Sequence, residues 1–158
     1  MSFGTGHHAT TYMMVKQMRG IDFNNKTVFD FGTGTGVLAI LAEKLGALKI
    51  IAIDNDDWSI TNAAENIQQN NCSKIQLLKT DNTEMNQQFD IILANINKNT
   101  ILGNFSSLTK QLGNNGILLL SGLLKEDETE ILQAVNQQSI RNTKKLIQDN
   151  WISIRLNY

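Results

Sequence analysis

The feature that most constrains this chain is a glycine-rich turn between two apolar runs, at residues 28–36 (Val-Phe-Asp-Phe-Gly-Thr-Gly-Thr-Gly). The run before the turn is typical of a buried strand, and the apolar stripe at residues 37–41 is typical of a helix. Glycines at such a junction let the backbone approach a nucleotide cofactor closely. The spacing is G-x-G-x-G, and Val37 stands where the dinucleotide fingerprint G-x-G-x-x-G has its last glycine.

An acidic residue follows at the distance expected for the second strand of a nucleotide-binding unit. Asp54 ends the apolar run at residues 50–53, about 20 residues after Gly32. A carboxylate at the tip of this strand suits a ribose because it can accept hydrogen bonds from both sugar hydroxyls. The turn and the acid together favour an adenosine-containing ligand.

Length and charge favour a single globular domain over residues 1–158. A net charge of −1 gives no general attraction to nucleic acid or anionic membranes, and no apolar run reaches the roughly 18 residues of a membrane span. Cys72 is the single cysteine, and the first residues lack an apolar leader. We therefore expect a cytoplasmic, monomeric protein without disulfides or membrane contacts.

The order of apolar segments predicts a doubly wound, Rossmann-like α/β sheet of mostly parallel strands. A short turn at Asp149-Asn150 should make the closing strand pair antiparallel. A further turn is expected at 113–116, and Asn55 or Asp56 is expected to cap the second α/β helix. The expected strands are 26–31, 49–53, 74–79, 88–94, 117–121, 140–147 and 151–157. One helix should begin near residue 7, and others should cover 36–45, 100–112 and 126–135. The helix that Asn55 or Asp56 caps should carry Ile60, Ala63, Ala64 and Ile67 on one face.

Ligands of open α/β sheets bind beyond the carboxyl ends of the strands, which makes the residues at those ends the candidates. Asp81 could accept a hydrogen bond from an adenine amino group, or it could be only a turn residue. Asn95 ends an apolar strand, where an unpaired amide is costly. We favour a role for Asn95 in orienting an amine over the alternative, a helix N-cap. The candidate segments are Gly32–Gly36, Asp54-Asn55, Asp81-Asn82 and residues 95–97.

The first residues leave two interpretations open. Gly4 and Gly6 belong either to a flexible leader or to a second backbone loop that closes over the ligand. His7 and His8 are neighbours, so they cannot share one helix face, and no further histidine completes a zinc site. No metal site is predicted.

Several segments of the chain resemble the bacterial PrmA-type ribosomal protein methyltransferases. This family uses S-adenosylmethionine (SAM) to methylate amino groups of large-subunit ribosomal protein L11. The resemblance extends along the chain from Phe3, and the F-G-T-G-x-H-x-T-T pattern is its most specific part. It rests on residues 3–11 (F-G-T-G-H-H-A-T-T), 30–36 (D-F-G-T-G-T-G), Asp54, 93–96 (L-A-N-I) and 120–124 (L-S-G-L-L).

The resemblance implies a class I methyltransferase fold, with seven strands and an antiparallel last strand, and SAM as the cofactor, with S-adenosylhomocysteine as the product. Asn95 would lie beside the transferred methyl group and the incoming amine, as the catalytic residue, and Asp54 would hold the ribose. The principal cofactor contacts would be Thr11, Gly32, Asp54 and Asn95. Phe3, Gly4, Thr5 and Gly6 would form a loop over the methionine end, and Thr33, Gly34, Asn55 and Asp81 complete the expected set.

The family also carries an N-terminal domain that binds the ribosomal protein, and these residues do not include it. We therefore expect residues 1–158 to be the catalytic domain, with ribosomal protein L11 as its substrate and no direct contact with nucleic acid. Three alternatives stay open: a class I methyltransferase with another target (another protein, a nucleic-acid base or a small amine), a SAM-binding module without turnover, and an NAD-linked oxidoreductase. Val37 argues against the last of these.

Overall fold

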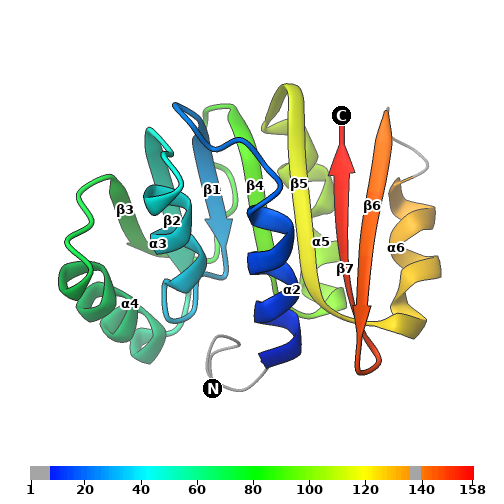
Figure 1. Ribbon diagram of the computed structural model, residues 1–158, viewed down its shortest axis with the longest axis horizontal. Helices are drawn as coiled ribbons and strands as arrows, with labels where there is room; N and C mark the ends of the chain where they lie inside the picture. Colours follow the sequence, from blue (N-terminus) through cyan, green and yellow to red (C-terminus); the bar gives the residue numbers. More distant parts are fainter. Residues whose placement is uncertain (1–7, 136–139) are drawn as a thin grey trace.

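A seven-stranded sheet in the order β3-β2-β1-β4-β5-β7-β6 organises the molecule (Figure 1). The computed structural model describes residues 8–135 and 140–158. Strands β1 to β5 are parallel, and β7 runs antiparallel to both β5 and β6. The predicted doubly wound sheet is confirmed. Its strands are β1 (Thr27–Phe31), β2 (Lys49–Asp54), β3 (Ile75–Lys79), β4 (Phe89–Asn95), β5 (Leu112–Leu124), β6 (Asn142–Gln148) and β7 (Trp151–Asn157).

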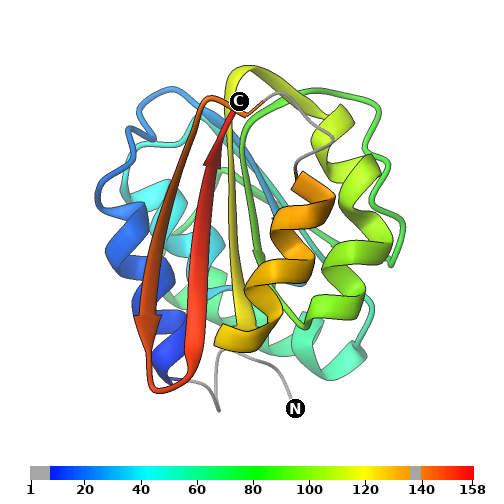
Figure 2. The ribbon, with the colours of Figure 1, turned by 90° about the vertical axis from the view of Figure 1, so that its right-hand side faces the viewer.

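Helices cover both faces of the sheet. Figure 2 shows α2 and α3 on one side and α5 and α6 on the other, and α4 packs against α3 and β3. None of the helices over the described residues is long and apolar enough to cross a membrane. The helices are α2 (His8–Met18), α3 (Val37–Lys44), α4 (Asp57–Gln69), α5 (Lys98–Lys110) and α6 (Glu128–Val135), and the 3-10 helix η1 (Lys125–Asp127) leads into α6.

The central strands form a core on each side of the sheet because their side chains alternate between the two faces. On β1, Val28 belongs to the apolar cluster that includes Met14 and Met18 of α2. Its neighbour Phe29 belongs to the opposite cluster and stacks on Phe89, with a distance of 5.1 Å between ring centroids. Burial on both faces explains why these strands are almost continuously apolar.

The predicted closing hairpin is confirmed. Asp149 and Asn150 have φ values of 50° and 66°, and they connect β6 to the antiparallel β7. Two successive residues with positive φ form the turn type that matches the twist of a hairpin, and Asp and Asn tolerate this conformation well.

Two predicted boundaries around α5 were wrong. The helix begins at Lys98 rather than at residue 100, because the side chain of Asn97 caps it by accepting a hydrogen bond from the backbone N–H of Thr100 at 2.9 Å. Leu112 belongs to β5, where it pairs with Phe89. The turn predicted at residues 113–116 is therefore an irregularity within the ladder between β4 and β5, which resumes where Ile117 pairs with Ile91.

Two glycines offer a test of how tightly the sheet edge is packed. Gly122 has a φ of 80°, and a Cβ placed there would lie 2.5 Å from the carbonyl oxygen of Ile96. We expect Gly122→Ala to lower the free energy of unfolding by roughly 2–3 kcal/mol. Gly103 lies in α5 with open space around it, so Gly103→Ala should raise the same quantity by about 0.5–1 kcal/mol.

Urea denaturation of the two variants and the wild type measures this difference. Equal effects of the two substitutions would contradict the packing described for Gly122.

Candidate functional site

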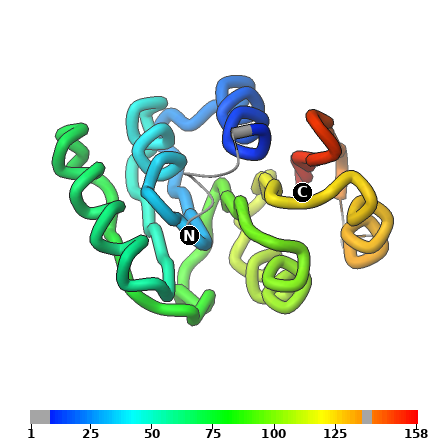
Figure 3. The backbone as a smooth tube through the Cα atoms, turned by 90° about the horizontal axis from the view of Figure 1, so that it is seen from below, coloured from blue at the N-terminus to red at the C-terminus, as the bar shows by residue number. Residues whose placement is uncertain are grey.

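A cavity of about 480 Å³ lies at the carboxyl ends of the parallel strands, and a volume of this size suits a small-molecule cofactor. Figure 3 looks onto this edge of the sheet, with α2 and α3 on one side and α5 and α6 on the other. Seven residues of the candidate segments line the cavity: Gly32, Gly34, Asp54, Asn55, Asp81, Ile96 and Asn97. The other lining residues among those described are Phe31, Asp56, Ser59, Thr80, Thr100 and Asn104.

The glycine turn after β1 needs glycine for two reasons. Gly32, Gly34 and Gly36 have φ values of 74°, 57° and 82°, a region that other residues rarely adopt. A Cβ at Gly32 would also lie 2.5 Å from Cγ2 of Ile96. The turn is anchored to the neighbouring strand, because the backbone N–H groups of Gly32 and Thr33 both donate to the carbonyl oxygen of Ile53.

The Asp54 carboxylate joins the glycine turn to the start of α4. Its Oδ2 atom accepts a hydrogen bond from the Gly34 backbone N–H at 2.9 Å, and its Oδ1 atom accepts one from the Asp56 backbone N–H at 3.1 Å. A carboxylate offers about four lone-pair sites, so each oxygen can accept a second bond. The half-buried group therefore holds the turn and can still accept from the two hydroxyls of a ribose.

A second carboxylate, which was not among the predicted site residues, lies directly below the turn. Asp30 is 1% exposed, and its Oδ2 atom accepts a hydrogen bond from the Thr33 hydroxyl at 2.7 Å. Burial raises the pKa of Asp30 to about 7, and the charge of Asp54 adds to this rise. The sequence feature that could have identified Asp30 is its position as a charged residue inside an apolar strand.

Thr33 lies behind the turn rather than in the cavity. Its side chain is buried, and its hydroxyl is committed to Asp30. Thr33 is not among the residues that line the cavity. Its predicted contact with the cofactor stays a prediction.

Asn95 is the last residue of β4, and its side-chain carbonyl oxygen is buried without a partner among the described residues. The residue is 6% exposed and lies opposite Ser121 in the sheet register. Its alternative role as the N-cap of the next helix is wrong, because Asn97 caps α5. A buried acceptor without a partner costs about 1–3 kcal/mol, so Asn95 is a candidate for contact with a ligand.

Asn95 does not itself line the cavity, although the next residue, Ile96, does. The buried hydroxyl oxygen of Thr11, on α2, also has no partner among the described residues. The helix α2 approaches β5 nearby, where the Ser121 hydroxyl donates to the carbonyl oxygen of Thr10 at 3.5 Å. Thr11 and Asn95, both predicted to contact the cofactor, thus each have a buried oxygen atom that is available for a hydrogen bond.

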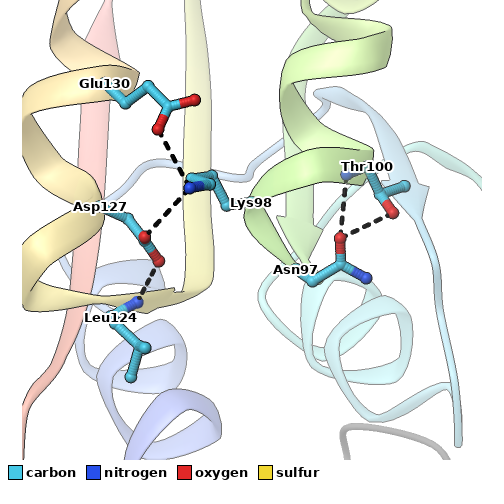
Figure 4. A network of polar contacts seen from close by, with 6 residues as sticks. All are labelled: Asn97, Lys98, Thr100, Leu124, Asp127 and Glu130. Atoms are coloured by element: carbon cyan, nitrogen blue, oxygen red, sulfur yellow. Dashed lines mark hydrogen bonds and ion pairs between the residues drawn. The ribbon is translucent and has the colours of Figure 1, made fainter.

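The segment after β4 is tied to the segment after β5 by the cluster of charges in Figure 4. Lys98 places its Nζ atom 3.0 Å from Oε1 of Glu130 and 3.6 Å from Oδ1 of Asp127. The other oxygen of Asp127 accepts a hydrogen bond from the Leu124 backbone N–H at 2.8 Å. Hydrogen bonds and charges at Glu130 raise the pKa of Lys98, with Asp127 adding to the effect.

The predicted loop over the methionine end of the cofactor cannot be placed, because Phe3, Gly4, Thr5 and Gly6 lie outside the described residues.

In the part of the chain that the structure describes, no group of three or more His, Cys, Asp or Glu side chains is placed to hold a metal ion. A second cavity, of about 570 Å³, is lined among the described residues by Leu124–Glu126 and Asn150, none of which was a predicted site residue.

The buried Asp30 leads to a prediction about pH. Its pKa is about 7 in the folded chain against an ordinary value of 3.8, so the folded state holds a proton that the unfolded state has lost between these values. The stabilisation from this group is complete below pH 4 and is lost as the pH rises through 7. Ionisation of Asp30 should lower the unfolding free energy of the wild type by about 4 kcal/mol between pH 4 and 8. Asp30→Asn cannot ionise, so this decrease should be absent in the variant.

Urea denaturation across this pH range measures the slope. Asp22→Asn, at an exposed position, is the control and should leave the wild-type slope in place. An unchanged slope in Asp30→Asn would contradict the buried, protonated carboxyl.

Comparison with known proteins identifies the family. The family model described as ribosomal protein L11 methyltransferase (PrmA) matches residues 1–158. A relative of the same name from Chlorobaculum parvum is 42% identical, over 97% of this chain and 55% of its own length. Another, from Porphyromonas gingivalis, is 40% identical over 98% of this chain and 54% of its own length. The chain thus spans about half the length of these curated relatives.

Solved structures agree with this comparison. The ribosomal protein L11 methylase from Lactobacillus delbrueckii subsp. bulgaricus superposes with a TM-score of 0.90 at 34% identity, covering 96% of this chain and 79% of that one. The tRNA m1G37 methyltransferase of M. jannaschii is similar in fold alone, with a TM-score of 0.72 at 19% identity over 91% of this chain and 47% of its own. The chain belongs to the ribosomal protein L11 methyltransferase (PrmA) family.

Proposed function

We propose that residues 1–158 form the catalytic domain of a SAM-dependent methyltransferase that modifies lysine or N-terminal amino groups of ribosomal protein L11. The observation that carries the proposal is the cavity that brings together the glycine turn, Asp54 and Asp81 in a chain of this family. Its proposed substrate is a ribosomal protein, so we propose a cytoplasmic location for the reaction.

The described residues fit an adenosyl cofactor. Gly32 and Gly34 leave room for close approach to the backbone, and Asp54 has free lone pairs for a ribose. Asp81 follows β3, the strand next to β2, and lines the same cavity, where a carboxylate can accept from an adenine amino group. SAM would supply a methyl group on a sulfonium, which is already a good leaving group.

The main tasks of the protein are then to orient the amine and to keep it neutral. Free lysine has a pKa of about 10.4, and only the neutral amine has a lone pair for attack. Removal from water next to the apolar end of β4 lowers this pKa. We propose that the free side-chain oxygen of Asn95 accepts an N–H of the amine and aims its lone pair along the line of displacement.

With SAM bound, the amine nitrogen would take the methyl group and the sulfur would keep the electron pair of the broken bond, so no further co-reactant would be needed. The methylated nitrogen would then give its extra proton to water. Asn95 carries no charge in this scheme and acts by position.

One rival function is supported by a specific observation. The chain spans about half the length of its curated relatives, and the first rival function is a module that binds SAM without turning over a protein substrate by itself. A different acceptor, such as another protein or a nucleic-acid base, is the second rival, and neighbours in fold include a tRNA methyltransferase.

Methyl transfer from radiolabelled SAM to intact ribosomal protein L11 tests the proposal. Asn95→Ala should lower kcat by about 100-fold or more, because the amine loses its orientation, while affinity for S-adenosylhomocysteine falls much less. Asn99→Ala, at an exposed position on α5, is the matched control and should behave as wild type.

Wild-type turnover in Asn95→Ala would refute the role of Asn95. Binding of S-adenosylhomocysteine by the wild type without any transfer to L11 would favour the binding module instead.

A further inference from the structure

The residues of α5 that line the cavity were not among the predicted site residues. Thr100 and Asn104 lie four residues apart on this helix, so they share one face, and both line the cavity. We infer that Asn104 recognises the adenine base of the cofactor through the base edge that carries N1 and the N6 amino group. This inference rests on the proposed function and adds a residue that determines specificity.

The order of the strands indicates where the base lies. The glycine turn follows β1, Asp54 ends β2, and Thr80 and Asp81 follow β3, the next strand along. A nucleoside with its ribose at Asp54 and its remaining part toward Gly32 must direct its base toward Asp81.

Asn104 lies at this same end of the cavity. The Thr83 hydroxyl, two residues after Asp81, lies 3.4 Å from Oδ1 of Asn104 and donates to the Ser107 hydroxyl at 2.8 Å. The loop after β3 and this part of α5 are therefore in direct contact. The inferred base site is the part of the cavity beside this contact, where Asp81 and Asn104 both line the wall.

The amide of Asn104 has the hydrogen-bonding capacity that adenine requires. One of its two N–H groups donates to the carbonyl oxygen of Thr100 at 2.9 Å, which leaves one donor. Oδ1 has a second lone pair beyond its long contact with Thr83. An asparagine amide can pair with adenine through one donor and one acceptor at once.

The bond to Thr100 also fixes which way the amide points. A reversed amide would place Oδ1 against the Thr100 carbonyl oxygen, where neither atom can donate. The fixed orientation suits a base with an amino group beside an acceptor nitrogen. Hypoxanthine has a carbonyl oxygen and an N–H at these positions, so it mismatches both Asn104 and the acceptor-only Asp81.

The loop that faces Asn104 is held at a fixed distance from α5. The buried Gln111 donates to the carbonyl oxygen of Thr83 and accepts from the backbone N–H of Met85, each at 2.7 Å. The oxygen and the NH2 group of the Gln111 amide are therefore both hydrogen-bonded. A base site with such fixed walls discriminates better between bases because little entropy is lost in ordering the walls when a base binds.

Calorimetric titration of the whole chain with S-adenosylhomocysteine and with S-inosylhomocysteine tests the inference. The wild type should prefer the adenosine compound by about 10-fold or more. Asn104→Leu, similar in shape, should weaken its binding about 10-fold and reduce the preference. Asn104→Asp, which lacks the donor, should do the same, and Asn99→Leu on the exposed face of α5 should change neither value.

Three results separate the outcomes. Unchanged affinity and preference in both Asn104 variants would overturn the inference. Thr83→Val loosens the loop without removing the amide, so an equal loss of preference in this variant would show that Asn104 acts only through the loop, which also overturns it. Binding of neither compound by the wild type would refute the proposed function itself.

Discussion

The site depends on the close packing of one residue between two glycines. Ile96 follows β4 and lies against Gly32, in the turn after β1, and against Gly122, near the end of β5. A Cβ at either glycine would come within 2.5 Å of an Ile96 atom. The ends of β1, β4 and β5 can therefore meet only because the positions that face Ile96 are glycines. This contact sets the positions of the glycine turn, Asn95 and the start of α5.

Carboxylates organise the other half of the site. Asp54 accepts hydrogen bonds from backbone N–H groups of the glycine turn and of the α4 N-cap, and Asp30 lies buried beneath the same turn with a raised pKa of about 7. Two acids so close together repel, and burial favours the neutral form of Asp30. Asp54 keeps the half-buried position in the cavity wall from which it can contact a ligand.

Local sequence patterns predicted most of the fold and part of the site. Apolar runs and glycine spacing predicted the sheet, and the distance between Gly32 and Asp54 pointed to residues that share one cavity. Patterns of this kind do not show contacts between distant segments, so Asn104 and the Lys98 ion pairs could not be predicted. The start of β5 was also missed, because pairing with β4 begins at Leu112, before an irregularity that resembles a turn in the sequence.

Calorimetric titration with S-adenosylhomocysteine, with NAD as the control, tests whether this cavity is the cofactor site. The wild type should bind S-adenosylhomocysteine at one site and should not bind NAD. Asp54→Ala should weaken the binding by about 10-fold or more, since two hydroxyls lose their acceptor. Binding of NAD alone, or equal binding of S-adenosylhomocysteine by the wild type and Asp54→Ala, would contradict the assignment of this cavity as the cofactor site.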